Sequence, residues 1–259
     1  MYKKQKVNFV NENGITLAGL LELPDKPAGY ALFAHCFTCG KDLLSASRIS
    51  EALVAKGIAV LRFDFSGLGG SEGDFANSHF SSNVDDLLAA AEYLSQHFMP
   101  PVLLIGHSLG GTAALVAATR LESVKCVATL GAPAEPAHIL RQFEARLDDI
   151  RSKGVAEVQL AGRHFFITKQ FLDDVEHFHL RDQLPGLGKA LLILHSPRDT
   201  IVGIKQAELL YSAARHPKSF ISLDSADHLL TSIKDARYAA NCIAAWAERY
   251  LPAVSDGSS

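Results

Sequence analysis

Short apolar runs alternate with longer amphipathic segments along most of this 259-residue chain. This pattern predicts strands for the runs and helices for the amphipathic segments. The later runs are almost continuously apolar, which is typical of strands covered on both faces of a parallel sheet. The expected strands are 7–10, 15–23, 30–34, 58–63, 102–105, 126–130, 190–195 and 219–223, and the expected helices are 44–56, 82–97, 109–121, 204–215 and 235–250.

A polar turn, Asn11-Glu12-Asn13-Gly14, separates the first two expected strands. Its Asn-Gly pair predicts an antiparallel hairpin, which would lie at one edge of the sheet. The units that follow read as β-α-β crossovers. The sequence therefore predicts an α/β fold with a mostly parallel, eight-stranded sheet and helices on both faces.

The alternation is interrupted after the sixth expected strand. A charged helical pattern (138–153), two short alternating runs (155–160 and 164–167) and an acidic helical pattern (170–180) occur there. Because ligands of such sheets bind at the carboxyl ends of the strands, we expect this insertion, at about 134–188, to form a small cap over a site. Its phenylalanines either line an acyl pocket or pack the cap onto the main domain; they are Phe143, Phe165, Phe166, Phe171 and Phe178.

The string Gly106-His107-Ser108-Leu109-Gly110 lies directly between an expected strand and an expected helix. In that context G-x-S-x-G is typical of a nucleophile elbow, a tight turn that holds a serine at positive φ. Side chains two residues before and after the serine would clash with neighbouring backbone, which explains the glycines. Ser108 is therefore the predicted nucleophile, at the start of a helix whose first N–H groups face the developing oxyanion.

A nucleophilic serine needs a base, and the base needs a carboxylate that holds it in one tautomer. In this topology the partners follow in the order serine, acid, histidine. Asp199 follows the expected strand 190–195, and His228 follows the expected strand 219–223. We predict a catalytic triad of Ser108, His228 and Asp199. Since the three must converge, residues 1–259 are expected to form a single domain rather than two smaller ones.

Other acids and histidines compete for these roles. Asp227 is adjacent to His228 and would have to fold back to reach Nδ1, and Asp224 is expected to shape the turn. Three further histidines are expected to form local hydrogen bonds rather than to act as bases: His35, His107 and His195.

The loop His35-Cys36-Phe37-Thr38-Cys39-Gly40 follows the third expected strand, where a second oxyanion donor should lie. By position, the backbone N–H groups of Phe37 and Leu109 are predicted to form the oxyanion hole. Cys36 stands where the common His-Gly-x pattern has glycine. The loop also contains a C-x-x-C spacing, so Cys36 and Cys39 are either an accessory redox pair or two small apolar side chains beside the site. We expect the second.

Neither a cofactor nor a metal is expected. The glycine-rich loop 64–73 departs from the dinucleotide pattern, because Glu72 stands where G-x-G-x-x-G needs its last glycine, and no G-x-x-x-x-G-K follows. We expect a turn beside the catalytic crevice instead. Three histidines of the cap segment lack the spacing of a known metal site: His164, His177 and His179.

Charge and cysteine content bear on partners and compartment. The chain has 25 basic and 28 acidic residues, with no long run of Lys or Arg, so neither nucleic acid nor a membrane surface is an expected partner. Four scattered cysteines are too few for a disulfide framework, which favours the cytoplasm. No run of about 18 apolar residues could span a bilayer. Residues 255–259 are expected to form a disordered tail.

Together these motifs resemble the α/β-hydrolase superfamily across nearly the whole chain. They are the elbow, the positions of Asp199 and His228, the loop at His35 and the turn Asp64-x-x-Gly67-x-Gly69-x-Ser71. More narrowly, segments 34–42, 61–67 and 216–220 look like the hydrolase half of the bifunctional α/β-hydrolase/OsmC-type proteins of bacteria. In that group Cys36 is the expected residue.

The narrower resemblance implies a partner but no substrate. OsmC-type domains reduce organic peroxides with paired cysteines. Such a domain, fused to this chain or associated with it, would follow near Tyr250.

The expected function is that of a serine hydrolase that cleaves a small-molecule carboxylic ester through an acyl-enzyme. Thioesterase, acyltransferase and peptidase activities are alternatives, since they use the same triad. A redox-linked module built on Cys36 and Cys39 is an alternative of a different class.

Overall fold

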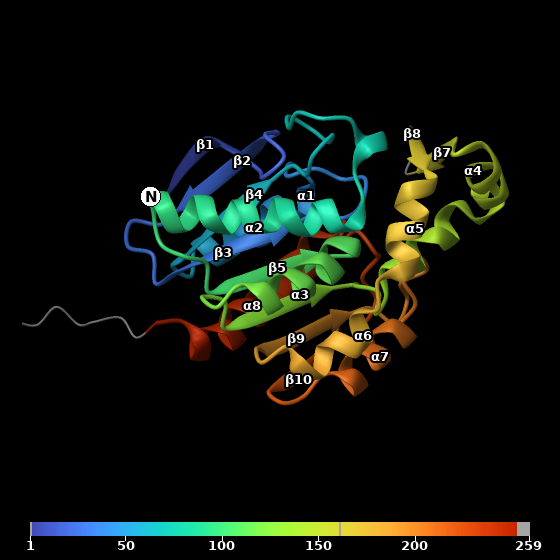
Figure 1. The fold of residues 1–259 in the computed structure, drawn as a ribbon. Coiled ribbons are helices and arrows are strands. Elements are labelled where there is room, and N and C mark those ends of the chain that lie inside the picture. Colours follow the sequence, from blue (N-terminus) through green and yellow to red (C-terminus); the bar gives the residue numbers. More distant parts are fainter. Residues whose placement is uncertain (1, 161, 253–259) are drawn as a thin grey trace, which may run out of the picture.

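The computed structural model describes residues 2–160 and 162–252, so the expected tail at 255–259 lies outside the described residues. Within them, eight strands form one sheet in the order β1-β2-β4-β3-β5-β6-β9-β10 (Figure 1). Their bounds are β1 Lys3–Val10, β2 Thr16–Leu23, β3 Gly29–Ala34, β4 Ile58–Phe63, β5 Leu103–His107, β6 Cys126–Leu130, β9 Ala190–His195 and β10 Lys218–Ser222. The eight-stranded sheet is confirmed, with each strand within a few residues of its predicted place.

The edge hairpin is also confirmed. β1 and β2 pair antiparallel from Val10↔Thr16 to Lys3↔Leu23. Gly14 adopts φ +75° in the turn between them, and the Asn11 side chain accepts hydrogen bonds from the backbone of Asn13 and Ile15. β2 then pairs antiparallel with β4, while the remaining strands pair in parallel.

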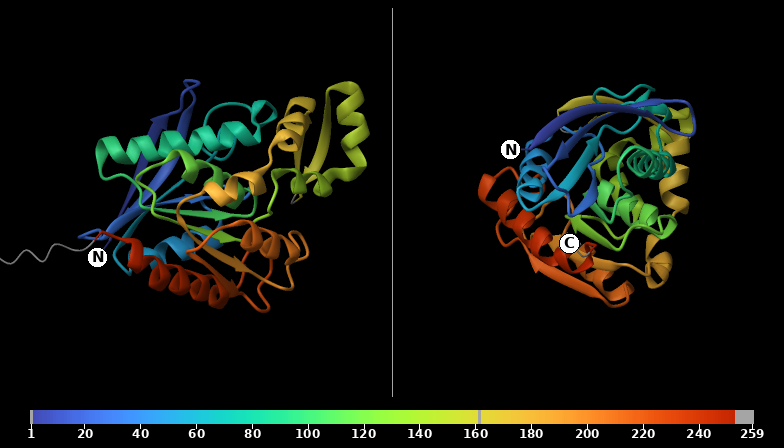
Figure 2. Two further views of the ribbon diagram at one scale, coloured as in Figure 1. Left: turned by 60° about the horizontal axis from the view of Figure 1, so that its bottom comes forward. Right: turned by 90° about the vertical axis from the view of Figure 1, so that its left-hand side faces the viewer.

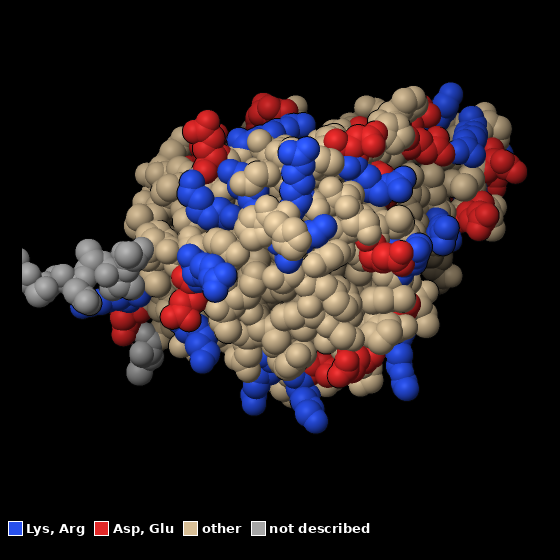
Figure 3. Space-filling model, turned by 90° about the horizontal axis from the view of Figure 1, so that it is seen from below, with Lys and Arg blue, Asp and Glu red and all other residues tan. Residues whose placement is uncertain are grey.

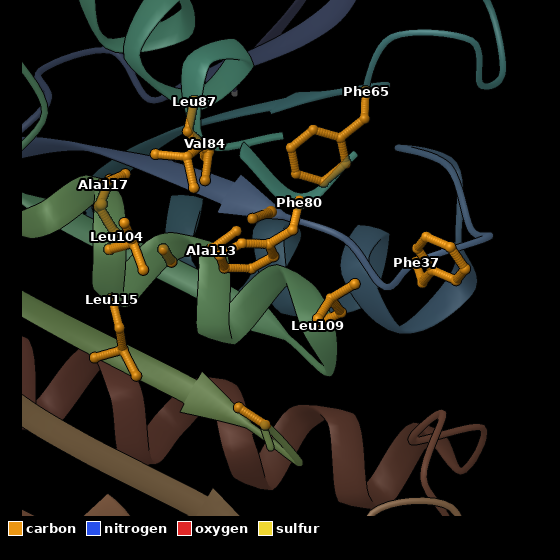
Figure 4. Close-up of a cluster of buried hydrophobic side chains, with 14 of the residues drawn as sticks. Phe37, Phe65, Phe80, Val84, Leu87, Leu104, Leu109, Ala113, Leu115 and Ala117 are labelled. Atoms are coloured by element: carbon orange, nitrogen blue, oxygen red, sulfur yellow. The ribbon is translucent and has the colours of Figure 1, made fainter. Parts of the chain in front are cut away.

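The sheet has a hydrophobic core on each face because side chains alternate along each strand. In β3, Leu32 belongs to the core beneath α2 (Phe80–His97) and α3 (Leu109–Arg120). Phe33, the next residue, belongs to the core beneath α1 (Leu44–Val54) and α8 (Ile233–Ala247). Figure 2 shows these helices on opposite sides of the sheet, and Figure 4 shows side chains of the first core. The α/β fold with helices on both faces is therefore confirmed.

The inserted segment lies between β6 and β9. Its elements are the 3₁₀ helix η2 Pro136–Arg146, α4 Leu147–Lys153, β7 Val155–Leu160, β8 Arg163–Thr168, α5 Lys169–His177, α6 Leu180–Gln183 and the 3₁₀ turn η3 Leu184–Gly186. β7 and β8 form an antiparallel hairpin. Figure 1 shows α4, α5 and this hairpin beyond the carboxyl ends of the central strands.

Two helical patterns of this segment are divided in the structure. The pattern at 138–153 becomes η2 and α4, and Phe143 inside η2 has the non-helical angles φ −138° and ψ 34°. The pattern at 170–180 ends as α5 at His177, and α6 starts separately at Leu180. Helical periodicity shows which residues face inward, but it cannot show where a chain turns to follow the surface that it covers.

The remaining helical elements are α7 Lys205–Ala213 and the short 3₁₀ turns η1 Phe75–Asn77 and η4 Glu248–Tyr250. In the part of the chain that the structure describes, no helix combines the length and apolarity needed to cross a membrane. On the face shown in Figure 3, acidic and basic side chains are interspersed.

Candidate active site

Ser108 lies at the turn between β5 and α3, where an elbow was predicted. Its backbone has φ 55° and ψ −130°, and its side chain is almost completely buried. A Cβ atom on Gly106 would lie 2.4 Å from the carbonyl oxygen of Gly110, and one on Gly110 would lie 2.2 Å from that of His35. Both distances are far below van der Waals contact, so the two flanking glycines are a steric requirement of this turn.

His228 brings Ser108 and Asp199 together. Its Nε2 lies 3.0 Å from Ser108 Oγ, and its Nδ1 lies 2.7 Å from Asp199 Oδ2. Asp199 is in the loop after β9 and His228 in the loop after β10. The three residues predicted to form the triad are therefore joined by hydrogen bonds, although they are far apart in sequence.

The Asp199 carboxylate is held from two sides. Besides His228 at Oδ2, the backbone N–H groups of Ile201 and Val202 donate to Oδ1 at 2.9 and 2.8 Å. Burial alone would raise the pKa of Asp199, but the hydrogen bond and charge of His228 and these two N–H groups outweigh it and lower the pKa. The carboxylate is thus kept ionised, as an acceptor for an imidazole must be.

Asp199, and neither of the two competing acids, holds His228 Nδ1. Asp227 accepts hydrogen bonds from the backbone and hydroxyl of Thr231 at 2.8 and 2.9 Å. Asp224 has φ 45° and shapes the turn after β10, as expected.

The three competing histidines each contact a backbone carbonyl, which confirms that they form local hydrogen bonds. His35 Nδ1 lies 2.8 Å from Cys36 O, His107 Nε2 2.7 Å from His228 O, and His195 Nε2 2.6 Å from Val202 O. Burial lowers the pKa of all three, that of His107 to about 3. They are therefore neutral near pH 7.

The predicted oxyanion donors belong to two elements, the loop after β3 and the start of α3. Ser108 is the N-cap of α3, so Leu109 is the first residue of the helix, and N–H groups of a first turn have no partner within their helix. Phe37 is in the loop after β3, and its side chain belongs to the same hydrophobic core as that of Leu109 (Figure 4). Both residues are buried.

The structure joins Cys36 and Cys39 in a disulfide, with their Cα atoms 5.2 Å apart. The expectation of two separate small side chains is therefore wrong. The Cys39 N–H donates to Cys36 O at 3.1 Å, so an i→i+3 turn brings the two residues together. The number of cysteines does not reveal such a local pair. A disulfide is no support for a reducing compartment.

A partly buried ion pair, which was not predicted from the sequence, holds the far end of the same loop. Lys41 donates to Asp64 through its backbone at 2.6 Å and through Nζ at 2.7 Å, and Gly70 N–H donates at 2.9 Å. Burial opposes the charge, but these donors lower the pKa of Asp64. The turn at 64–73 therefore anchors the loop 35–40, which we call the oxyanion loop after its predicted role. An acidic residue at a strand end and a lysine just after C-x-x-C-G were the available signals.

Phenylalanines of the inserted segment contact this loop. The Phe171 ring of α5 lies 5.0 Å from the Phe37 ring, and Phe165 reaches Phe37 through Phe75. Phe165, Phe171 and Phe143 are buried, whereas Phe166 is 55% exposed. The three buried rings pack the segment onto the rest of the molecule. Of the two predicted roles, their burial therefore favours packing over lining an acyl pocket.

Comparison with known proteins places this arrangement in context. A family model described as serine aminopeptidase, S33 (Hydrolase_4) matches residues 39–176. The structure of an esterase domain from a Rhodothermus marinus protein is 47% identical, with a TM-score of 0.80, and the match covers 96% of this chain and all of that one.

More distant relatives share the fold. The chain is 26% identical over 209 residues to the mitochondrial palmitoyl-protein thioesterase ABHD10 of Mus musculus, which covers 77% of this chain and 68% of that protein. The structure of Est1E from Butyrivibrio proteoclasticus with bound ferulic acid is 18% identical, with a TM-score of 0.76, and covers 93% of this chain and 98% of that one.

Proposed function

Because this chain belongs to the α/β-hydrolase family described by the serine aminopeptidase S33 model and is an esterase-like serine hydrolase, we propose that Ser108, His228 and Asp199 cleave a carboxylic ester. The observation that carries the proposal is the continuous path from Ser108 Oγ through the His228 ring to Asp199, with distances of 3.0 and 2.7 Å. These are the contacts that acyl transfer by a serine requires.

In the acylation half of the reaction, Ser108 Oγ attacks the acyl carbon while His228 Nε2 takes the hydroxyl proton. The carbonyl oxygen becomes an oxyanion, which the N–H groups of Phe37 and Leu109 bind. Asp199 stabilises the imidazolium. His228 then gives its proton to the leaving alcohol, and the acyl group stays on Ser108.

Deacylation repeats these steps with water. His228 removes a proton from the water, the resulting hydroxide attacks the acyl-enzyme, and the oxyanion forms in the same place. Collapse of the intermediate breaks the bond to Ser108 Oγ, which takes back the proton from His228. The chain's own groups carry out every proton transfer.

The test is the Ser108→Ala variant, assayed on a short p-nitrophenyl ester and with a fluorophosphonate label. The variant should lose both labelling and activity, with kcat lower by several orders of magnitude, since comparable knockouts lose on the order of 10⁶. Ser152→Ala is a matched control, because the hydroxyl of this exposed serine donates to the backbone carbonyls of Asp148 and Asp149 in its own helix. Labelling of Ser108→Ala at the wild-type level would overturn the proposal.

We propose that residues 134–188 cap this site within a single domain formed by residues 1–259. The position of α4, α5 and the β7–β8 hairpin beyond the strand ends supports this role, as does the contact between Phe171 and Phe37 (Figure 1). Urea unfolding and limited proteolysis test the single domain. One cooperative unfolding transition, with residues 134–188 and the rest of the chain digested together, would support it. A protease-resistant core that lacks 134–188 would contradict it.

A thioester is a second candidate substrate, favoured by the similarity to a protein named as a palmitoyl-protein thioesterase. The two substrate classes share the triad, so only relative rates distinguish them. An acyl-coenzyme A and a p-nitrophenyl ester of the same acyl length should be compared over several chain lengths. Peptide and acyl-acceptor substrates belong in the same panel.

The disulfide favours a further, redox-linked role for Cys36 and Cys39. A dithiol reductant would convert the bond to two thiols beside Phe37. Thiol titration before and after dithiothreitol, with esterase activity measured in both states, tests this role. Equal activity in both states would contradict a link between the pair and catalysis.

The proposed relationship to OsmC-type fusions predicts a partner. The resemblance of segments 34–42, 61–67 and 216–220 to the hydrolase half of those proteins supports it. An OsmC-type domain supplied as a separate protein should co-elute with this chain in gel filtration, and independent elution would count against association.

A further inference from the structure

His35 lies at the end of β3 with only 1% of its surface exposed, beside the loop that carries Phe37. Its Nδ1 is 2.8 Å from Cys36 O, and its Nε2 is 3.3 Å from the backbone nitrogen of Phe65. The ring of Phe65 packs edge-on against the imidazole at 4.8 Å. The triad chemistry makes no use of this buried histidine.

These two contacts determine the tautomer of His35. The Phe65 backbone nitrogen can only donate, so Nε2 accepts and carries no proton. Burial lowers the pKa of His35 and keeps the ring neutral, so its single proton is on Nδ1. Nδ1–H therefore donates to the Cys36 carbonyl.

The Cys36 carbonyl and the Phe37 N–H belong to one peptide plane. In a trans peptide the two groups point in opposite directions, and this peptide is not among the cis bonds of the described residues. Fixing the carbonyl thus fixes the direction of the N–H. A second donor, Cys39 N–H, meets the same carbonyl at 3.1 Å, which leaves it no free lone pair.

We propose that His35 is a positioning residue of the oxyanion hole: its Nδ1–H holds the Cys36 carbonyl away from the site and so aims the Phe37 N–H at the oxyanion. This inference rests on the proposed function. The Cys36–Cys39 bond closes the loop, and two hydrogen bonds hold the Cys36–Phe37 peptide plane: one from the His35 imidazole at 2.8 Å and one from Cys39 N–H at 3.1 Å.

Two variants separate this role from simple packing. An asparagine amide ends near the place of Nδ1, so His35→Asn keeps a donor for Cys36 O. A glutamine amide ends near Nε2, so His35→Gln keeps only the contact with Phe65. Losing one oxyanion donor costs about 10²- to 10³-fold in kcat, and a misaimed donor should cost about 10- to 100-fold.

The expected result is that kcat of His35→Gln falls by about 10- to 100-fold at nearly unchanged KM, and that His35→Asn recovers most of the loss. Affinity for a trifluoromethyl ketone, whose serine adduct carries an oxyanion, should fall in parallel with kcat/KM. Equal kcat values for the two variants, whether close to wild type or both lowered, would overturn the proposal. Urea unfolding midpoints identify any difference due to stability.

The wild-type protein gives an independent test. Nitrogen-15 NMR of protein labelled at histidine should show His35 with a protonated Nδ1 and an unprotonated Nε2, and the opposite tautomer would overturn the proposal. Failure of the proposed function would look different, since wild-type protein would then neither hydrolyse esters nor react with a fluorophosphonate.

Discussion

Asp199 Oδ2 lies 2.7 Å from His228 Nδ1, while the other carboxylate oxygen accepts two backbone N–H groups of its own loop. The two backbone N–H groups thus fix the carboxylate, which in turn orients the imidazole of His228. Because the two oxygens have different partners, replacing Asp199 with an amide of the same shape should disturb the site.

Asp199→Asn should abolish most activity with little effect on folding. The amide oxygen would stay with the two N–H groups, and the amide NH₂ would face His228 Nδ1. The imidazole would then carry its proton on Nε2, where it cannot accept the proton of Ser108. We expect kcat to fall by about 10⁴-fold, as in comparable triads. Asp227→Asn, which alters only side-chain contacts to Thr231, should stay within a few-fold of wild type.

Ser108 should respond differently to alanine and to glycine in stability, although both changes remove Oγ. Alanine keeps the strained backbone of φ 55° and ψ −130°, whereas glycine adopts it readily. After allowing for the larger entropy of an unfolded glycine, Ser108→Gly should be about 1 kcal/mol more stable than Ser108→Ala. Urea unfolding of the two variants measures the difference directly. Equal free energies would mean that the elbow is unstrained.

The central strands were predictable from sequence because they are apolar runs, and the elbow because its chemistry is local. Ser108 needs two glycines, a strand before it and a helix after it, and all of these are adjacent in the chain. Asp199 and His228 could be predicted because topology fixes which loops meet at the carboxyl edge of the sheet. The order of the strands was not predictable, since an apolar run such as β4 does not specify that β2 and β3 are its neighbours.

The contacts that support the site were harder to predict. The ion pair of Lys41 with Asp64 and the tautomer of His35 depend on which atoms meet after folding, and no pattern in one segment records that. The disulfide at Cys36 was visible as a spacing, but its bonded state depends on the turn between the cysteines. Sequence thus predicted the groups expected to react, and the structure added those that hold them in place.

Acid should destabilise the protein well above the range in which carboxylates titrate. Buried His35, His107 and His195 have ordinary pKa values near 6.5 in the unfolded chain and lowered values in the folded protein, about 3 for His107. Below pH 6.5 the unfolded chain therefore binds protons that the folded chain does not. The free energy of unfolding decreases as the pH is lowered. Each such histidine contributes a slope of up to about 1.4 kcal/mol per pH unit.

Urea unfolding between pH 7 and 5 measures this slope. His107→Gln should give a shallower dependence than wild type, because it removes one of the histidines whose pKa is lowered in the folded protein. The comparison uses the pH slopes of the variant and the wild type, not their absolute free energies of unfolding. An unchanged slope would show that folding does not lower the pKa of His107.

Phe171 should matter for stability far more than Phe166, although both belong to the inserted segment. The Phe171 ring is 2% exposed and packs against Phe37 at 5.0 Å and Phe143 at 6.5 Å, whereas Phe166 is 55% exposed on β8. Phe171→Ala leaves a cavity beside the oxyanion loop and should lower the free energy of unfolding by about 3 to 5 kcal/mol. Phe166→Ala should change it by no more than about 0.5 kcal/mol. If the two variants lose equal stability, Phe171 does not pack this segment onto the oxyanion loop, and an open position lining the acyl pocket becomes the better interpretation.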